Sequence, residues 1–225
     1  MISIIIPVLN EAKTIQTTLL TLEKSPSLEI IVVDGGSEDD TLKLAQEWGA
    51  ITISSPQTGR AKQMNTGAAI ASGEILLFLH ADTHLPRGYA KMVQDTLGRS
   101  QAIAGAFELK IAGEMRALRW VERMVNLRSH YCSLPYGDQS LFLKATTFQD
   151  LGGFPDIPLM EDFEFVRQLR KAGRIYIVPH PVLTSGRRWQ KLGVLKTTAI
   201  NQVIILGYFL GVSPYRLAQW YRTFQ

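Results

Sequence analysis

Short apolar runs alternate with amphipathic segments through the first 80 residues of the chain. The apolar runs predict buried strands, and the segments between them, with apolar residues at helical spacing, predict helices. The predicted strands cover residues 2–8, 30–33, 51–54 and 75–79, and the predicted helices cover 12–24, 37–48 (with Ser37 as N-cap) and 61–71. This alternation is typical of an α/β fold with a Rossmann-like, mostly parallel sheet flanked by helices.

The second half of the chain has a less regular order of elements. We predict helices at residues 87–97, 115–127 and 161–171, strands at 107–111, 140–143 and 175–178, and two final helices joined near Ser213 and Pro214. No internal repeat or low-complexity linker interrupts the sequence. We therefore expect one domain, residues 1–190, followed by a C-terminal helical extension, residues 191–225.

The composition favours one sizeable hydrophobic core, because 46% of the 225 residues are hydrophobic. Cys132 is the single cysteine, which excludes an internal disulfide and is typical of a reducing compartment. The first residues lack the basic segment of a secretory signal, and Pro7 interrupts their apolar run. We therefore expect a cytoplasmic protein.

The net charge of +4 conceals an uneven distribution. Residues 165–225 contain ten Lys or Arg and no Asp or Glu, so the first 164 residues carry a net charge of −6 (14 basic and 20 acidic side chains). A basic segment favours a polyanion, a membrane surface or a phosphate-bearing ligand, or it forms a solvated basic face. Among polyanions, we expect no nucleic-acid partner.

The nineteen residues between Lys196 and Arg216 carry no charge. This length borders on that of a membrane span, but the polar residues, glycines and Pro214 argue against one. We favour an amphipathic helix in the membrane interface, peripheral on the inner face of the cytoplasmic membrane. The side chains that would meet anionic headgroups are Lys191, Lys196, Arg216 and Arg222. A core helix or a homodimer contact is the alternative.

Polar side chains follow the strand predicted at residues 75–79. Asp82 stands there between His80 and His84, and ligands of open parallel sheets bind at the carboxyl ends of strands. Asp82 could hold a divalent cation on a phosphate-bearing ligand, or it could cap the following helix. No Gly-x-Gly-x-x-Gly follows the first strand and no Walker A motif occurs, which argues against a dehydrogenase or a P-loop enzyme.

Four motifs occur in a specific order: Ile-Ile-Ile-Pro-Val-Leu-Asn-Glu at residues 4–11, Val-Asp-Gly-Gly-Ser-Glu-Asp-Asp-Thr at 33–41, His-Ala-Asp at 80–82 and Met-Glu-Asp at 160–162. This order, over about residues 1–189, resembles family 2 glycosyltransferases with the GT-A fold. The stretches 59–65, 78–83 and 186–189 are similar to a bacterial and cyanobacterial branch labelled arsenosugar-biosynthesis-type. The resemblance implies inverting transfer of a sugar from a nucleotide-diphosphate donor to an acceptor hydroxyl, with a nucleotide-binding half (1–100) and an acceptor half (101–190).

The resemblance also implies a donor site built from several strand ends. The nucleotide-binding residues it suggests are Pro7, Asn10, Glu11, Asp34, Ser37, Arg60, Gln63, Ala81 and Asp82, and the diphosphate-binding residues are Arg187, Arg188 and Trp189. Guanidinium groups suit a diphosphate because they pair bidentately with phosphate oxygens. From the residues alone, Asp34 and Ser37 would equally form a turn and a helix cap, and the arginines an exposed basic segment.

On the acceptor side, the resemblance implies that Asp162 is the general base and that Glu161 positions the acceptor or the donor. Such a base removes the proton of the acceptor hydroxyl on the face opposite the leaving group. Without the resemblance, two acids at a helix start would indicate favourable pairing with the helix dipole. Gly137, Asp138 and Gln139 are predicted to face the acceptor or the donor sugar.

The metal motif departs from the family pattern, because His80 stands where an Asp-x-Asp motif has its first acid. By resemblance the last acid is the metal ligand, and that role falls to Asp82, with His80 and His180 as weaker candidates. Each histidine could equally be structural. Mn²⁺ tolerates imidazole and Mg²⁺ prefers oxygen, so the motif favours Mn²⁺ over Mg²⁺ without excluding Mg²⁺.

Several alternatives stay open at this point. UDP-sugars are favoured over GDP-sugars as donors by the resemblance, and the acceptor is open, with a lipid-linked one among the candidates. A sugar nucleotidyltransferase is the rival enzyme, although the chain lacks a Gly-rich, Arg-containing loop after the first strand. A non-catalytic nucleotide-sugar-binding or membrane scaffold protein is the rival outside enzymes.

Overall fold

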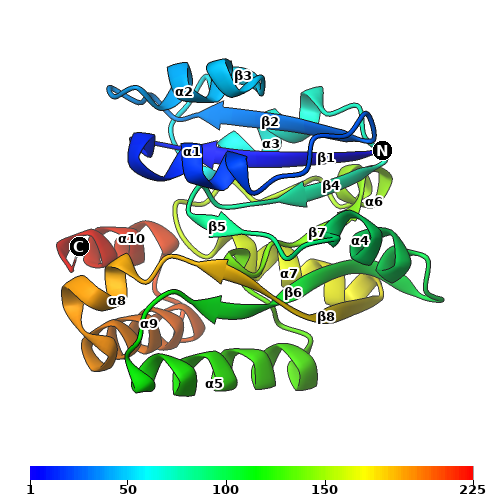
Figure 1. Cartoon of the computed structure of the whole chain (residues 1–225). Helices are drawn as coiled ribbons and strands as arrows, with labels where there is room; N and C mark the ends of the chain where they lie inside the picture. Colours follow the sequence, from blue (N-terminus) through cyan, green and yellow to red (C-terminus); the bar gives the residue numbers. More distant parts are fainter. Residues whose placement is uncertain (225) are drawn as a thin grey trace.

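A computed structural model describes residues 1–224 of the chain (Figure 1). Its centre is a sheet with the strand order β3-β2-β1-β4-β7-β6-β8-β5. The strands are β1 (Ile2–Val8), β2 (Leu28–Asp34), β3 (Ile51–Ser54), β4 (Ile75–Phe78), β5 (Thr83–His84), β6 (Ala102–Ile111), β7 (Phe142–Lys144) and β8 (Arg174–Thr184). The helices are α1 (Ala12–Leu20), α2 (Thr41–Trp48), α3 (Arg60–Ile70), α4 (Tyr89–Leu97), α5 (Arg116–Cys132), α6 (Ala145–Asp150), α7 (Glu161–Ala172), α8 (Arg187–Leu192), α9 (Val194–Phe209) and α10 (Pro214–Thr223), with a 3₁₀ turn η1 at Gly137–Gln139.

The sheet is mixed, and its parallel part comes first. β1 pairs in parallel with β2 and β4, and β2 does so with β3. In the second half β6 and β8 are parallel, whereas β7 runs antiparallel to β4 and β6, and β5 antiparallel to β8. The predicted α/β fold with helices around a mostly parallel sheet is therefore confirmed. Every antiparallel pair of the sheet involves either β7 or β5.

Both faces of the sheet are buried, which explains why its strands read as continuous apolar runs. Ile4 and Ile6 of β1 face a cluster that includes residues of α1, α4 and α5, whereas Ile5 faces a second cluster with α3 and α7. The arrowheads of β1, β2, β4, β6 and β8 point toward the side of the molecule where α8, α9 and α10 lie (Figure 1). The strand ends and the C-terminal helices thus share one side.

Several element boundaries differ from the predictions, among them the start of β6 at Ala102 instead of residue 107. The helix predicted at 12–24 ends at Leu20, and α2 begins at Thr41, so Ser37 is not its N-cap. The Ser37 hydroxyl donates instead to Asp34 Oδ1 at 2.5 Å inside the preceding loop. β8 is longer than predicted because it pairs with β6 from Arg174 to Thr184. The pairing continues across a shift in register between Val178 and Pro181, where the apolar run used for the prediction ends.

The C-terminal helices pack on one another and on α7 rather than extending away from the domain. Ile200, Ile204 and Leu217 form a small cluster between α9 and α10. The Tyr208 hydroxyl donates to Glu164 of α7. Within residues 1–224, no helix has both the length and the apolar character needed to cross a membrane. The membrane or dimer contact of this segment stays a prediction.

Candidate active site

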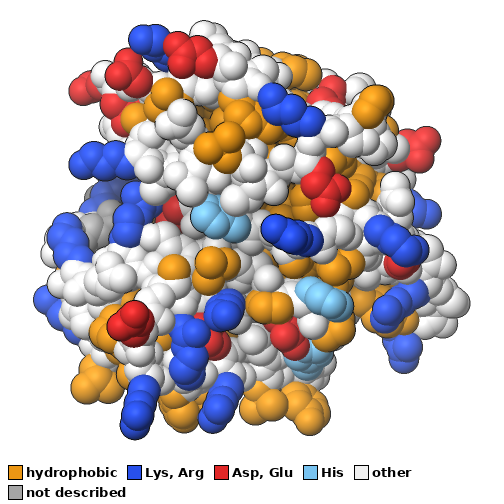
Figure 2. Space-filling view, in the orientation of Figure 1, with side chains coloured by type: hydrophobic (Ala, Val, Ile, Leu, Met, Phe, Trp, Pro, Cys, Tyr) orange, Lys and Arg blue, Asp and Glu red, His pale blue; other side chains and the backbone are white. Residues whose placement is uncertain are grey.

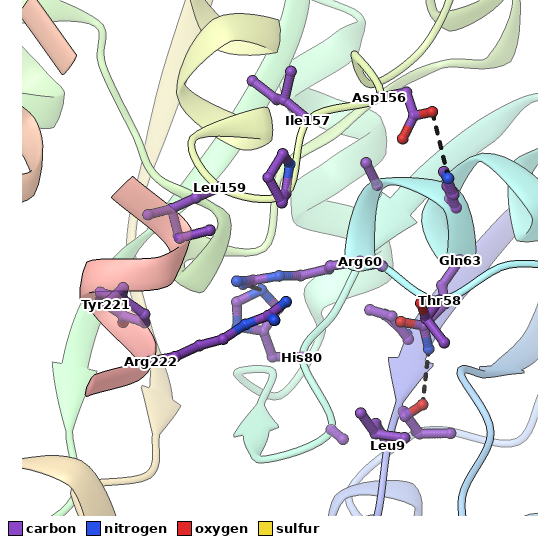
Figure 3. Close-up of a pocket in the computed structure, with 18 of the residues that line it drawn as sticks. Leu9, Thr58, Arg60, Gln63, His80, Asp156, Ile157, Leu159, Tyr221 and Arg222 are labelled. Atoms are coloured by element: carbon purple, nitrogen blue, oxygen red, sulfur yellow. Dashed lines mark hydrogen bonds and ion pairs between the residues drawn. The ribbon is translucent and has the colours of Figure 1, made fainter. Parts of the chain in front are cut away.

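A cavity of about 710 Å³ opens at the carboxyl ends of β1 and β4 (Figure 3). Its walls come from four places: the ends of these strands, the start of α3, the loop before α7 and the inner side of α10. The lining includes Pro7, Glu11, Arg60, Lys62, Gln63, His80, Ala81, Asp82, Tyr221 and Arg222. Seven of these ten, all but Lys62, Tyr221 and Arg222, were predicted for the donor site.

Gln63 fixes the start of α3 against the sheet. Its amide nitrogen donates to the carbonyl oxygens of Val8 at 2.7 Å and Val33 at 2.8 Å, so both of its N–H groups are engaged. The side chain is buried among β1, β2 and α3. Gln63 therefore holds the start of α3 in place and also lines the cavity, and its predicted contact with a nucleotide stays a prediction.

Arg60 joins the cavity to the start of α7. Its Nε lies 3.0 Å from Glu161 Oε1, and the Glu161 side chain is only 3% exposed. Arg60 Nη1 lies 3.3 Å from His80 Nε2. A guanidinium has no acceptor atom, so His80 accepts this hydrogen bond as a neutral imidazole.

The charges around this network alter two pKa values. Burial, reinforced by the Arg60 guanidinium, lowers the pKa of His80 to about 4, which agrees with a neutral ring. Burial also raises the pKa of Glu161, and the neighbouring Asp162 carboxylate adds to that rise while Arg60 opposes it. The Glu161 side chain is too buried to contact a ligand directly, and its carboxylate instead holds the Arg60 guanidinium in place.

Arg187 bridges two acids at the rim of the cavity. Its Nη2 lies 3.1 Å from Glu11 Oε2 and 3.0 Å from Asp82 Oδ2. Gly186 lets the chain approach this rim, because a Cβ there would stand 2.0 Å from the Ala112 carbonyl oxygen. The structure thus brings Glu11, Asp82 and Arg187 together, as the sequence predicted for a donor site, although Arg187 is not one of the residues that line the cavity.

Asp34 and its neighbours form a closed turn beside the cavity. The buried Asp34 carboxylate accepts hydrogen bonds from the backbone N–H groups of Gly36 at 2.9 Å and Ser37 at 3.0 Å. Asn10 accepts from Glu38 N at 2.9 Å, and its own N–H donates to Ser37 Oγ at 2.9 Å. These predicted nucleotide residues therefore stabilise the loops after β1 and β2 and do not line the cavity.

Three other predicted residues also lie outside the cavity lining. Arg188 stacks on Tyr221, 4.3 Å from its ring centre, and donates to the Tyr221 hydroxyl. Trp189 packs against the main core cluster. His180 is exposed in the irregular stretch of β8 between Val178 and Pro181. Arg188 therefore links α8 to α10, Trp189 is a packing residue, and His180 is separate from Asp82.

The 3₁₀ turn η1 carries the predicted acceptor residues and contacts α7. The backbone N–H of Gly137 donates to Asp162 Oδ2 at 2.7 Å, and a Cβ on Gly137 would stand 3.0 Å from that oxygen. Gln139 is fully buried, and its Nε2 donates to the Phe107 carbonyl at 2.8 Å. Gly137 thus holds Asp162, while Gln139 anchors the turn and is not available to a ligand.

Asp138 lies beside Asp162 with an unusual environment. Its Oδ1 is buried and has no hydrogen-bond partner among the described residues. Burial raises the pKa of Asp138 to about 6, and the charge of Asp162 adds to this although Arg128 opposes it. An acid with a raised pKa stabilises the fold when protonated, and this contribution is lost as the pH rises through about 6.

Replacing Asp138 by asparagine is therefore expected to stabilise the protein at pH 7.5 and to have little effect at pH 4.5. The gain at pH 7.5 is about 1–2 kcal/mol, within the limit of about 1.4 kcal/mol per pKa unit. Thermal unfolding at the two pH values measures it, with the exposed Asp150→Asn as control. An equal change of Tm at both pH values would contradict the assignment.

Arg222 lines the cavity, although the sequence analysis assigned it to a membrane surface. It was predicted to face a membrane, but it reaches from α10 into the cavity and lies beside Arg60 and His80 (Figure 3). With Lys62, which is 3.5 Å from Asp156, three basic side chains therefore line this cavity. The only signal in the sequence was the excess of basic residues after residue 165, which names no single position.

Comparisons with known proteins identify the family of the chain. The model of the family described as "Glycosyl transferase family 2" matches residues 3–152. Glycosyltransferase AglE of Haloferax volcanii is 26% identical over 198 residues, covering 81% of this chain and 65% of AglE. A PGL/p-HBAD biosynthesis glycosyltransferase of Mycobacterium bovis is 35% identical over 116 residues, covering 48% of this chain and 43% of that protein. The chain thus spans less than two thirds of either relative.

Solved structures with the same fold include two with bound donors. TarS of S. aureus in complex with UDP-GlcNAc has a TM-score of 0.66 at 18% identity, covering 82% of this chain and 58% of that one. The mannosyltransferase PcManGT of Pyrobaculum calidifontis, in complex with GDP-Man and Mn²⁺, has a TM-score of 0.63 at 23% identity, covering 82% and 56%. At such identities the likeness supports the GT-A fold alone, whereas the family match covers most of the chain. This chain belongs to glycosyl transferase family 2.

Proposed function

We propose that this protein transfers a sugar, with inversion and with the help of a divalent cation, from a nucleoside-diphosphate donor bound in the cavity. The observation that carries the proposal is the convergence of Asp82 and three basic side chains on one cavity at the ends of β1 and β4. A donor needs this combination because its diphosphate is anionic and leaves with further negative charge. The ligands in the titles of the TarS and PcManGT structures support a nucleotide-sugar donor.

In this proposal the nucleotide occupies the part of the cavity that Pro7, Glu11 and Ala81 line. The diphosphate lies toward Arg60 and Arg222, whose side chains Figure 3 shows in the cavity. Arg60 is held by the buried Glu161, so its charge is oriented before the ligand arrives. Preorganised positive groups stabilise a leaving group better than mobile ones, because they need no reorganisation during the reaction. Residues 1–100 would then bind mainly the donor, and 101–190 the acceptor.

The side chains present fit a divalent cation at Asp82. Within residues 1–224 no three His, Cys, Asp or Glu side chains gather to hold a metal by themselves. Asp82 and the neutral His80 both line the cavity. Asp82 would supply one donor, His80 would supply a second once its Nε2 gives up the hydrogen bond from Arg60, and the ligand's phosphate oxygens would complete the set. The cation would neutralise diphosphate charge, and Arg187 would release Asp82 Oδ2 to make room. The imidazole favours Mn²⁺ over Mg²⁺.

Asp162 is the general base in this proposal. Its carboxylate is held in position by the N–H groups of Gly137 and Phe163, both at 2.7 Å. It lines a narrow hollow shared with Arg60 and His80, which places it next to the charged end of the donor cavity. Asp162 would accept the proton of the acceptor hydroxyl as the new glycosidic bond forms and the nucleoside diphosphate leaves.

Arg222 gives a sharp test of where the diphosphate lies. We expect Arg222→Ala to weaken nucleoside diphosphate binding about tenfold, because a hydrogen bond to a charged group contributes about 1.5–3 kcal/mol. Binding of the free nucleoside should be unchanged. Arg216→Ala, on the exposed side of the same helix, is the matched control. Isothermal titration measures both, and equal affinities of the two variants for the diphosphate would refute the assignment.

The reaction itself is tested by incubating the protein with UDP- and GDP-sugars, Mn²⁺ or Mg²⁺, and a panel of soluble and lipid-linked alcohols. We expect release of one nucleoside diphosphate together with a product whose anomeric configuration, read by proton NMR, is opposite to that of the donor. UDP-sugars are the first choice. Retention of configuration would overturn the inverting mechanism, and a nucleotidyl product would favour the rival enzyme class. The arsenosugar-biosynthesis-type branch stays a prediction until the acceptor is known.

A further inference from the structure

Helix α5 is fixed to the open edge of β6 by side-chain hydrogen bonds. β7 pairs with β6 only at Ala104 and Gly105, so the rest of that edge needs other partners. Asn126 supplies them to both the N–H and the carbonyl of Leu109, at 2.8 and 3.0 Å. Glu122 accepts from Ile111 N at 2.5 Å. The outward face of α5 is therefore a rigid part of the fold.

This outward face is apolar and aromatic along its whole length. Its exposed large side chains are Trp120, Met124, Leu127 and Tyr131, with exposed fractions of 61, 47, 52 and 82%. Their spacing of four, three and four residues places them in one stripe along the helix. A stripe of this kind on the outside of a folded domain indicates a contact surface, whereas scattered single residues would not.

The charges beside the stripe are basic. Arg116 and Arg123 are exposed next to it, and no exposed residue of α5 is acidic. Glu122 of α5 is buried and accepts from Ile111 N, Glu114 precedes the helix, and the Glu108 carboxylate lies 2.8 Å from His130. The lower edge of Figure 2, where Figure 1 places α5, shows hydrophobic and basic side chains interleaved.

We propose that this face of α5, defined by Arg116, Trp120, Arg123, Met124, Leu127 and Tyr131, docks the protein on an anionic lipid membrane. Aromatic and aliphatic side chains beside arginines are the features of helices that lie in the membrane interface. Charge complementarity selects this occupant, because the exposed face of α5 carries arginines and no exposed acid, so a second copy of the face offers them no negative partner whereas an anionic headgroup does. The helix lies on the surface without crossing the bilayer. The proposal is independent of the sugar-transfer reaction.

Vesicle co-sedimentation of the full chain tests the proposal. We expect binding to phosphatidylcholine vesicles with 30% phosphatidylglycerol to exceed binding to pure phosphatidylcholine vesicles by at least fivefold, and to fall in 0.5 M NaCl. Two variants separate the contributions: Met124→Glu/Leu127→Glu removes the apolar contact, and Arg116→Glu/Arg123→Glu reverses the charge. Each should bind anionic vesicles roughly tenfold more weakly.

Matched controls distinguish the α5 face from general surface effects. Leu20→Glu replaces a leucine that is 69% exposed on α1, and Lys43→Glu reverses an exposed charge on α2. Both controls should bind like the wild type, and all variants should keep the wild-type Tm within about 2 °C and its nucleotide affinity. Equal binding of the α5 variants and the controls would overturn the proposal. A dimer of the wild type that the α5 variants convert to a monomer would assign the face to self-association instead.

Discussion

Replacing Asp162 by asparagine is expected to lower the rate of sugar transfer by about 10²–10⁴-fold, the usual contribution of a general base. Asparagine keeps the size of the side chain and an oxygen for the Gly137 N–H, but it accepts no proton. Donor binding should stay within about threefold of the wild type, because Asp162 lies beside the donor cavity without lining it. Steady-state rates and titration with the nucleoside diphosphate measure the two effects separately.

The control for this prediction is Glu164→Gln in the first turn of the same helix. Glu164 pairs with Arg167 at 2.7 Å and with Tyr208, so it points toward α9 and away from the cavity. Its replacement should leave the rate within about threefold. A rate for Asp162→Asn as high as that of the control would remove Asp162 from the role of base, and Asp138, with its pKa of about 6, would be the next candidate.

Arg60→Met is expected to weaken donor binding and to destabilise the fold at the same time. The Glu161 carboxylate would remain buried without its cation, and an unpaired buried charge costs several kcal/mol. Because 44% of the Arg60 side chain is exposed, we expect about 2–3 kcal/mol of lost stability. Urea unfolding measures this loss. Lys62→Met is the control for stability alone, because Lys62 also lines the cavity but its pair with the 70% exposed Asp156 lies at the surface.

The double variant Arg60→Met/Glu161→Gln separates the two roles of Arg60. With no charge left unpaired, stability should return to within about 1 kcal/mol of the wild type. Donor binding should stay weak, since the diphosphate still lacks its guanidinium. Recovery of both properties would mean that Arg60 acts only through the fold. A loss of stability no larger than that of Lys62→Met would show that the pair with Glu161 has no structural role.

Much of the fold follows from local patterns in the sequence. The runs of β1, β2 and β4 are apolar on both faces because both faces are buried, so their position and type could be read directly. The long β8 was largely missed, because three consecutive exposed residues, Pro179 to Pro181, interrupt it before buried and exposed positions alternate up to Thr184. Only pairing with β6, a non-local interaction, extends it to Thr184.

The candidate site shows the same division between local and non-local information. Motifs at strand ends identified Glu11 and Asp82, because parallel strands end at the same edge of a sheet. A motif does not distinguish a residue that lines a cavity from one that only supports its wall, so Gln139 was assigned to a ligand although it is fully buried and bonds to a carbonyl of the sheet. Gln63 does both, because it lines the cavity and bonds to two carbonyls of the sheet. Arg222 lies on α10, whose position depends on packing against α9 and on the contact of Tyr221 with Arg188 of α8, which no local pattern encodes.

The most direct test of the central claim is a binding measurement on the donor cavity. Thermal shifts are recorded for a panel of nucleoside diphosphates and their sugars, each with and without Mn²⁺, for the wild type and for Asp82→Ala. We expect one diphosphate to stabilise the wild type by about 2.7 kcal/mol at 100 times its Kd. This stabilisation should require the cation and be lost in Asp82→Ala. Folded wild-type protein that no nucleoside diphosphate stabilises would contradict the assignment of this cavity to a nucleotide-sugar donor.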